Sequence, residues 1–324
     1  MKYYFIINPV AGKLDATKDI TPELRRTARM AGIAEKDLFI QKTQRPGHAT
    51  VLARQAAQSG EAVKIYAVGG DGTFNETLRG AMPYPNAAVG LIPCGSGNDF
   101  LRNFGTKEEF RDLRDQFKSQ PMTIDMIQTD NSYAAAICSA GLDAQVAYGI
   151  PKFRRVPFCH SEMAYKLSIV QSLLGKRSTK LNITVDGQEY ERECLMVAIC
   201  NGCAYGGGFI AAPEARLDDG LMDVLIVHKM PLVRIAQVLP TYQAGKHIKN
   251  GEIITELEGK LEFFRAKKVS LHTADPKENI IINIDGECGP RTELNAAIVP
   301  MSARILLPSK VYQRYQSKQS CEEN

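Results

Sequence analysis

Three glycine-rich segments hold the residues that could do chemistry on a phosphate. They run from Asn8 to Lys13, from Gly69 to Thr73 and from Pro93 to Asp99. Glycines at such places allow positive φ and let backbone N–H groups approach a phosphate closely, and a helix that starts just after the loop favours an anion. Each segment alone is equally consistent with a turn that uses Gly, Asn and Asp for conformational reasons. Together they predict a site for a nucleotide or another phosphate.

Two carboxylates in these segments indicate a divalent cation. A carboxylate about 4 Å from a phosphate is repelled by ~1 kcal/mol even in water, and a bridging Mg²⁺ reverses that sign. Asp71 and Asp99 therefore favour a triphosphate whose magnesium is held partly through water, as in phosphoryl transfer. The alternative for each residue is an Asp that caps the following helix.

The sequence lacks the best known nucleotide-binding motifs. None of its Gly-Lys pairs is followed by Ser or Thr, which excludes the Walker sequence, and the protein-kinase signatures are missing as well. Asn75 stands where a Rossmann fingerprint would have its third glycine. The predicted phosphate site is therefore of another type.

Two turns in the second half carry further carboxylates. The turn from Asp218 to Gly220 could bind a hard cation together with backbone carbonyls, or it could simply be a turn. In the run from Asp285 to Glu287, a carboxylate at a strand end could accept a proton from an alcohol. The run from Asp186 to Gln188 repeats the same Asp-Gly pair, which is the strongest hairpin signal. The residues alone therefore do not rank Glu287 above a hairpin corner.

The elements that must position the three glycine-rich segments alternate between strand and helix up to about Gln120. That order is typical of an open parallel sheet, in which the three loops gather at the carboxyl edge. The expected strands are Tyr3 to Ile7, Leu38 to Ile40, Val63 to Val68 and Ala87 to Ile92, and the expected helices are Pro22 to Ala31, Ala49 to Ser59, Phe74 to Met82 and Lys107 to Ser119.

Beyond Pro121 the periodicity shifts toward two, which indicates mainly antiparallel strands. Two helices interrupt them, Ser161 to Leu174 and Leu232 to Ala244, and we expect both to pack on the core. We expect an α/β nucleotide-binding domain over residues 1–125, with 308–324 as a candidate completion, and a β-sandwich domain over residues 126–307, with the active site in a cleft between them. The expected strands are Thr123 to Gln128, Ala134 to Ser139, Lys180 to Val185, Leu195 to Ile199, Met222 to Val227, Val269 to Thr273, Ile280 to Ile284 and Ala303 to Leu307.

The composition excludes several classes of protein. The 324 residues are 44% hydrophobic and 23% charged, which is ordinary for a globular chain and excludes disordered and collagen-like proteins. A net charge of +4 is far below that of a dedicated nucleic-acid binder. No apolar run approaches the ~20 residues that cross a bilayer, and the N-terminus is no secretory signal. We therefore expect a cytoplasmic protein with reduced cysteines and no nucleic-acid partner.

One segment mixes basic and apolar residues. Pro151 to Phe158 contains Arg154 and Arg155, and Lys176 and Arg177 follow the next predicted helix. Such a mixture suits anionic lipid headgroups, at about 1 kcal/mol per basic residue near a charged surface. A solvated loop is the alternative.

Taken together, the motifs resemble the soluble bacterial lipid kinases with a diacylglycerol kinase catalytic domain. The run from Gly69 to Thr73 by itself is also similar to NAD kinases and phosphofructokinases. Its combination with four further motifs makes the resemblance specific, and it covers nearly everything from Lys2 to Leu307. These motifs are Gly95 to Phe100, Ala140 to Asp143, Ala212 to Gly220 and Asn283 to Glu287.

The resemblance implies roles for individual residues. Glu287 would accept the proton from the lipid hydroxyl, supported by Asp285, and Asp71 would organise magnesium and phosphate. A structural Mg²⁺ would be bound by the carboxylate of Asp219 and the carbonyls of Arg216 and Leu221. The ATP site would be lined by Asn8, Pro9, Val10, Ala11, Gly12, Thr43, Gly70, Asp71, Gly72, Thr73, Phe74, Asn75, Glu76, Ser96 and Asp99.

The expected activity is therefore an ATP-dependent, magnesium-requiring kinase of a neutral lipid. Diacylglycerol, giving phosphatidic acid, is the first expectation, and ceramide, a sphingoid base or another long-chain alcohol stay open as acceptors. A soluble NAD kinase and a catalytically idle lipid or nucleotide sensor are the rivals. The enzyme would be cytoplasmic and touch the inner membrane face transiently, and a homodimer stays open.

Overall fold

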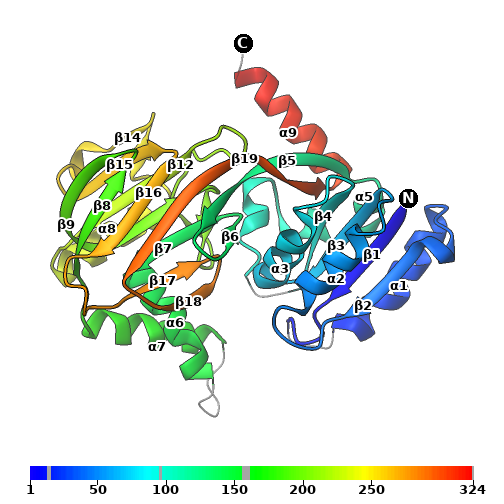
Figure 1. Cartoon of the computed structure of the whole chain (residues 1–324), viewed down its shortest axis with the longest axis horizontal. Helices are drawn as coiled ribbons and strands as arrows, with labels where there is room; N and C mark the ends of the chain where they lie inside the picture. Colours follow the sequence, from blue (N-terminus) through cyan, green and yellow to red (C-terminus); the bar gives the residue numbers. More distant parts are fainter. Residues whose placement is uncertain (13–15, 95–96, 155–160, 323–324) are drawn as a thin grey trace. The chain divides into compact units, whose positions relative to one another are not determined.

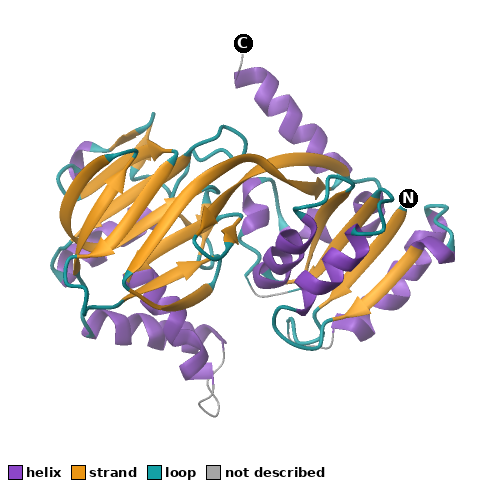
Figure 2. Ribbon diagram, viewed as in Figure 1, coloured by secondary structure: helices purple, strands orange, loops and turns teal. Residues whose placement is uncertain are grey.

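The computed structural model describes residues 1–12, 16–94, 97–154 and 161–322, and its chain divides into two units (Figure 1). Unit 1 comprises Met1–Ile124 and Met301–Asn324, and unit 2 comprises Asp125–Pro300. The chain leaves unit 1 within strand β5 (Gln120–Thr129) and returns within strand β19 (Glu293–Leu307). The predicted fold class, an α/β domain with a mainly antiparallel β domain, is confirmed (Figure 2).

The sheet of unit 1 is parallel, with the strand order β2-β1-β3-β4-β19. β3 and β4 are buried along nearly their whole length, as expected for parallel strands that are covered on both faces. The strands are β1 (Lys2–Ile7), β2 (Leu38–Lys42), β3 (Val63–Gly69) and β4 (Ala87–Pro93). The helices are α1 (Ala16–Met30), η1 (Glu35–Asp37), α2 (His48–Ala57), α3 (Asp71–Ala81), η2 (Phe100–Asn103), α4 (Lys107–Arg111), α5 (Leu113–Phe117) and α9 (Ser309–Glu322).

The return of the chain to unit 1 begins at residue 301, before the expected boundary at residue 308. Residues 301–307, which we assigned to the second domain, lie in unit 1. The reason is that Ile305 and Leu306 pair in parallel with Val89 and Gly90 of β4.

One predicted helix is broken into two. The expected helix from Lys107 to Ser119 is interrupted at Asp112, whose backbone is extended (φ −67°, ψ 95°). Its side chain accepts hydrogen bonds from the N–H groups of Arg114 and Asp115. The residue therefore acts as an N-cap for a second helix, because a short carboxylate competes well for free N–H groups.

Unit 2 is built mainly of antiparallel strands. The path β18-β17-β7-β9-β8-β16-β19 is extended by β12, which pairs with β9 and β15. Inward-facing residues alternate along β8 (Leu181, Ile183 and Val185 are buried), the pattern of a strand with one face in the core. The strands not yet given are β6 (Tyr133–Ala134), β7 (Ile137–Gly141), β8 (Thr179–Val185), β9 (Gln188–Cys200), β10 (Ala204–Tyr205), β11 (Phe209–Ile210), β12 (Met222–His228), β13 (Ile248–Lys249), β14 (Glu252–Ile253), β15 (Leu261–Ala266), β16 (Lys268–Thr273), β17 (Ile280–Ile284) and β18 (Glu287–Arg291).

The described helices of unit 2 behave differently from one another. They are α6 (Leu142–Arg154), α7 (Ser161–Leu174), α8 (Leu232–Gln243) and η3 (Thr255–Leu257). α8 packs on the core through Ile235, Val238 and Tyr242, as predicted. For α7 the predicted core stripe is wrong, because its large apolar residues are exposed to solvent. The helix does reach the core, but through Leu173, which lies outside that stripe. In the described ranges, no helix is long and apolar enough to cross a membrane.

Candidate functional site

The carboxyl ends of the parallel strands of unit 1 are in register. Ile7 of β1 lies opposite Lys42 of β2 and Val68 of β3, and Gly69 lies opposite Pro93 of β4. This register gathers at one edge the residues that follow the strands, namely Asn8, Thr43, Gly70 and Cys94. The predicted convergence of the three glycine-rich segments at the carboxyl edge is therefore present.

The first and second segments are joined by Asn8. Its Nδ2 donates a hydrogen bond to Oγ1 of Thr73 at 3.1 Å, and its Oδ1 accepts one from the N–H of Val10 at 3.2 Å. The N–H of Ala11 donates to the carbonyl of Asn8 at 3.2 Å, which closes a tight turn. Asn8 thus fixes the first segment on the N-terminal turn of α3.

The first segment also lies directly on the end of β4. Gly12 has φ +85°, and a Cβ at this position would lie 2.5 Å from the carbonyl oxygen of Cys94. Both the left-handed backbone and the close approach require glycine here. The described residues of the three segments therefore contact one another, and we call these residues the phosphate cradle.

The Asp71 carboxylate holds the third segment of the phosphate cradle. It accepts hydrogen bonds from the backbone N–H groups of Asn98 (2.6 Å), Asp99 (3.1 Å) and Phe100 (3.2 Å). Asn98 is left-handed (φ 66°), and its Nδ2 donates to the carbonyl of Gly69 at 3.0 Å. These N–H groups are bonded to Asp71, so a phosphate would instead meet the first N–H groups of α3, which no helix can satisfy internally.

Asp99 lies close enough to Asp71 to affect its ionisation. Burial and, next, the negative charge of Asp99 raise the pKa of Asp71. The Oδ1 of Asp99 accepts a hydrogen bond from Nε of Arg102 at 3.1 Å. Two neighbouring carboxylates repel each other when both are ionised, and a bound cation would stabilise their charged forms.

Glu76 accepts hydrogen bonds from the end of the loop that follows β2 and from the start of α2. Its carboxylate accepts hydrogen bonds from the N–H groups of Gly47 (2.9 Å) and Ala49 (3.2 Å) at the start of α2, and its carbonyl accepts one from Oγ1 of Thr50 at 2.8 Å. Thr43 begins this loop, and its N–H donates to the carbonyl of Ile7 at 2.9 Å. Glu76 therefore positions the segment that contains Thr43.

The other predicted ATP-site residues differ in how exposed they are. Phe74 and Asn75 are 2% and 3% exposed, so their side chains pack inside unit 1 and do not line an open surface. Val10 is 85% exposed, and Gly72 has open space around its Cα. Pro9 lies between Asn8 and Val10, and Ser96 is outside the described residues.

In unit 2, Asp285 anchors the hairpin between β17 and β18. Its backbone is left-handed (φ 45°), as is that of Gly286 (φ 90°), which matches a two-residue Asp-Gly turn. Its carboxylate accepts hydrogen bonds from the N–H groups of Ala135 (2.5 Å), Ala136 (3.1 Å) and Ile137 (2.8 Å). Asp285 thereby ties the turn to the segment that precedes β7.

Glu287 is the first residue of β18, and its side chain is exposed. It pairs with Ile284 across the turn that Asp285 anchors. The hairpin at Asp186 is built in the same way, since Asp186 also has φ 45° and its carboxylate accepts hydrogen bonds from the N–H groups of Lys267 and Lys268. Local geometry therefore fixes the backbone of Glu287, and its catalytic role stays a prediction.

The turn predicted to bind a structural metal is held by an arginine. The N–H of Leu221 donates to Oδ1 of Asp219 at 3.0 Å, and the guanidinium of Arg265 pairs with the other oxygen of Asp219. Arg265 also pairs with Asp223 at 3.2 Å. The N–H of Gly220 donates to Oδ2 of the buried Asp125 at 2.7 Å.

The donor chemistry of both predicted magnesium positions suits this ion, because carboxylate and carbonyl oxygens are its preferred ligands. At the first position the negative charges of Asp71 and Asp99 repel each other, and Asp99 also pairs with the guanidinium of Arg102. At the second, Asp219 pairs with the guanidinium of Arg265. Within the described residues, no three His, Cys, Asp or Glu side chains converge as a ready metal site.

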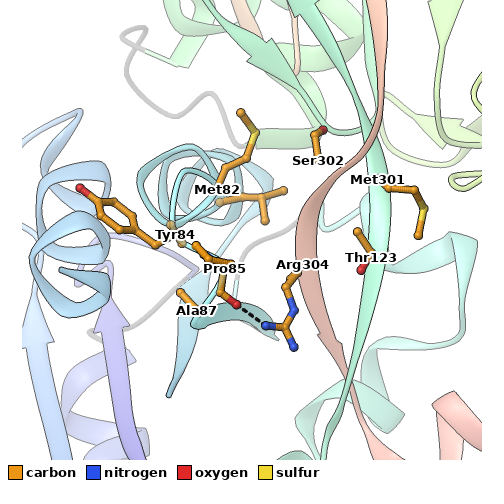
Figure 3. Close-up of a pocket in the computed structure, with 10 residues that line it drawn as sticks. Met82, Tyr84, Pro85, Ala87, Thr123, Met301, Ser302 and Arg304 are labelled. Carbon is orange, nitrogen blue, oxygen red and sulfur yellow. Dashed lines mark hydrogen bonds between the residues drawn. The ribbon is translucent and has the colours of Figure 1, made fainter. Parts of the chain in front are cut away.

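Unit 1 also contains a pocket of about 230 Å³, whose lining residues are drawn in Figure 3. It is lined by Met82, Tyr84 and Pro85 from the chain after α3, together with Thr123 and Arg304. The guanidinium of Arg304 donates to the carbonyl of Pro85. Because the pocket includes the first residue of β4, it belongs to the amino edge of the sheet, opposite the edge that carries the three loops.

Sequence reasoning gave Asp143 no role of its own. It is the second residue of α6, between apolar neighbours, and both of its carboxylate oxygens are buried. Burial raises the pKa of Asp143 to about 6. The available signal was a lone acidic residue between Leu142 and Ala144.

This burial predicts a pH dependence of stability. The folded pKa of about 6 lies above the ordinary 3.8, so the folded state binds more protons between these values and stability falls as the pH rises through this window. We expect Asp143→Asn to lessen that fall, by about 1 kcal/mol of unfolding free energy between pH 5 and pH 7. Urea unfolding at both pH values measures it, with the exposed Asp275→Asn as the control. Parallel profiles for the unchanged protein and Asp143→Asn would contradict the assignment.

Comparison with known proteins matches both halves of the chain. A family model described as the diacylglycerol kinase catalytic domain matches residues 2–129. A second, described as the YegS C-terminal NAD kinase beta sandwich-like domain, matches residues 136–307.

Individual proteins match over nearly the whole length. A diacylglycerol kinase of Staphylococcus haemolyticus is 27% identical over 95% of this chain and 88% of its own, and one of Bacillus subtilis is 28% identical over 88% and 89%. A crystal structure of a diacylglycerol kinase from Bacillus anthracis has a TM-score of 0.66 at 21% identity, covering 96% of this chain and 98% of that one. The structural likeness concerns the fold alone.

Proposed function

This chain belongs to the family of diacylglycerol kinase-like phosphotransferases, and from that premise we propose that it is an ATP-dependent kinase of a neutral lipid. The γ-phosphoryl group of ATP passes to the hydroxyl of the lipid, and the acceptor we propose is diacylglycerol, which gives phosphatidic acid. The relatives named above support this acceptor, since they are named diacylglycerol kinases.

The observation that carries the proposal is the phosphate cradle. Asn8, Gly12 and Asp71 each tie one glycine-rich segment to another, so the three segments act as one preorganised unit. Phosphoryl transfer proceeds through a loose transition state, and its catalysis depends on positioning and on charge stabilisation. In this proposal the N-terminus of α3 binds the phosphates of ATP.

The remaining charge on the triphosphate is neutralised by Mg²⁺ when that ion is bound, and Asp71 and Asp99 are the residues that would hold it. Asp71 has a second task in the proposal, because it keeps residues 98–100 in place. Glu287 accepts the proton of the lipid hydroxyl as the new P–O bond forms and the bond to the leaving ADP breaks. Asp285 orients Glu287 by anchoring the turn that precedes it.

The acceptor also determines where the enzyme works. Diacylglycerol resides in membranes and ATP in the cytoplasm, so we propose a cytoplasmic protein that works at the inner membrane face.

The test is a phosphorylation assay with labelled ATP, Mg²⁺ and mixed micelles that contain diacylglycerol, ceramide, a sphingoid base or no lipid, beside a lipid-free arm with NAD. We expect a labelled, organic-extractable product with diacylglycerol and none when Mg²⁺ is chelated. If ceramide or the sphingoid base were labelled instead, that lipid would be the acceptor in place of diacylglycerol. Labelled NAD in the lipid-free arm, or ATP bound without turnover in every arm, would refute the lipid kinase.

A further inference from the structure

Helix α7 has an unusual distribution of residues between its two faces. Its buried face consists of small side chains, Ala164, Ser168 and Ser172. This face packs on α6, where a Cβ at Gly149 would lie 2.3 Å from Oγ of Ser168. Oγ of Ser168 also donates to the carbonyl of Val146 in α6 at 2.6 Å. Small residues therefore let the two helices approach closely, and this face of α7 lies against α6.

The opposite face carries the large apolar side chains. Met163, Leu167, Val170 and Leu174 are 52%, 40%, 52% and 79% exposed. Their spacing of four, three and four residues puts them on one line along the helix. We call these four residues the α7 outer stripe. A contiguous apolar surface of this kind marks an interaction site more often than scattered single residues do.

The sequence around the outer stripe is strongly basic. Residues 144–180 contain seven Lys or Arg and one Glu, a net charge of +6, whereas the whole chain carries +4. Lys166 lies three residues after Met163 and four before Val170 and therefore borders the stripe. Lys176 lies two residues after the end of the helix, and its ammonium pairs with Glu278 at 2.5 Å.

This charge distinguishes between two occupants of the stripe. A second copy of the chain in a two-fold dimer would place the same patch against itself, and two basic segments would then repel each other. An anionic bilayer supplies both an apolar interior and negative headgroups. Charge complementarity therefore favours the bilayer.

We propose that the α7 outer stripe is the surface with which this protein docks on anionic lipid bilayers. The four apolar side chains enter the boundary between headgroups and acyl chains, and the flanking lysines and arginines meet the headgroups. α6, on which α7 packs, also contacts β17 and β18, the hairpin of Glu287 (Figure 1). This inference deepens the proposed function and rests on it, since a kinase of a membrane lipid needs such a surface.

The test is flotation of the purified protein with vesicles that contain no diacylglycerol, in the absence of ATP. We expect the unchanged protein to bind phosphatidylcholine vesicles that contain phosphatidylglycerol, to bind pure phosphatidylcholine vesicles much less, and to be released by salt. The double variant Leu167→Gln with Leu174→Gln should partition at least about tenfold more weakly. The matched control is Val233→Gln with Leu239→Gln, two exposed apolar residues of α8, which should bind like the unchanged protein.

Three results would overturn the proposal. They are absence of binding to anionic vesicles, an equal loss in the α8 control, and light scattering that shows a dimer which the α7 variant converts to a monomer. Activity of the unchanged protein on a dispersed short-chain diacylglycerol tests the kinase separately. Vesicle binding without phosphorylation would refute the kinase proposal and leave the docking surface supported. Phosphorylation without vesicle binding would support the kinase proposal and refute the docking surface.

Discussion

Replacing Glu287 with Gln is expected to lower kcat for lipid phosphorylation by about 10²- to 10⁴-fold, the usual contribution of a positioned proton acceptor. Glutamine keeps the size and hydrogen-bonding capacity of the side chain, but its amide cannot take the hydroxyl proton. KM for ATP should change little, because the residues proposed to bind the nucleotide belong to unit 1. The stability of the fold should also be unchanged, since Glu287 is exposed.

The chain offers a matched control for this change. Glu189 is an exposed glutamate of β9, just after the Asp186 turn, which is built like the turn before Glu287. Glu189→Gln removes an exposed carboxylate near the other hairpin, one residue beyond the position that matches Glu287, and should leave kcat unaltered. Initial rates at saturating ATP and thermal unfolding of both variants provide the comparison. A Glu287→Gln enzyme with near-normal kcat would assign proton removal to another group.

The arrangement of the phosphate cradle could be predicted from the sequence because it follows from topology. Alternating strands and helices produce a parallel sheet, and in such a sheet every strand-to-helix loop leaves from the same edge. The strands end at Ile7, Gly69 and Pro93, each within one residue of the expected end. The convergence of their loops required no knowledge of side-chain contacts.

The partners of the carboxylates could not be predicted in the same way. Asp71 bonds N–H groups 27 to 29 residues further along the chain, and Asp285 bonds N–H groups about 150 residues before it. A sequence pattern reports neighbours within an element, and these contacts depend on how distant loops pack. The sequence therefore suggested a chemical role for both residues, but it did not predict that their carboxylates hold distant loops by hydrogen bonds.

Helix α7 is a second case in which the sequence pattern could not predict a tertiary contact. The spacing of Met163, Leu167, Val170 and Leu174 correctly indicates an apolar helical stripe. Periodicity reports that the stripe exists but not what covers it. The close approach between Gly149 and Ser168 decides which face is buried, and that approach is a tertiary feature.

Replacing Asp71 with Asn is expected to abolish ATP binding and turnover together. The carboxylate accepts three backbone N–H groups of residues 98–100. An Asn side chain offers one oxygen as acceptor and turns an N–H₂ donor toward these donors. Each N–H group left without a partner costs about 1–3 kcal/mol where it is buried, so the third segment of the phosphate cradle should lose its fixed position.

Two measurements separate this positioning role from a purely metal-binding one. Amide hydrogen exchange at residues 98–100, without nucleotide or Mg²⁺, should be faster in Asp71→Asn, because the protecting acceptor is lost. The matched control is Asp186→Asn, since Asp186 also accepts backbone N–H groups, of Lys267 and Lys268 in unit 2. That variant should lose protection locally and keep ATP binding. If exchange at residues 98–100 stayed normal in Asp71→Asn while the Mg²⁺ requirement rose, Asp71 would act through the cation alone, and the loop would be held by Asn98 and its bond to Gly69.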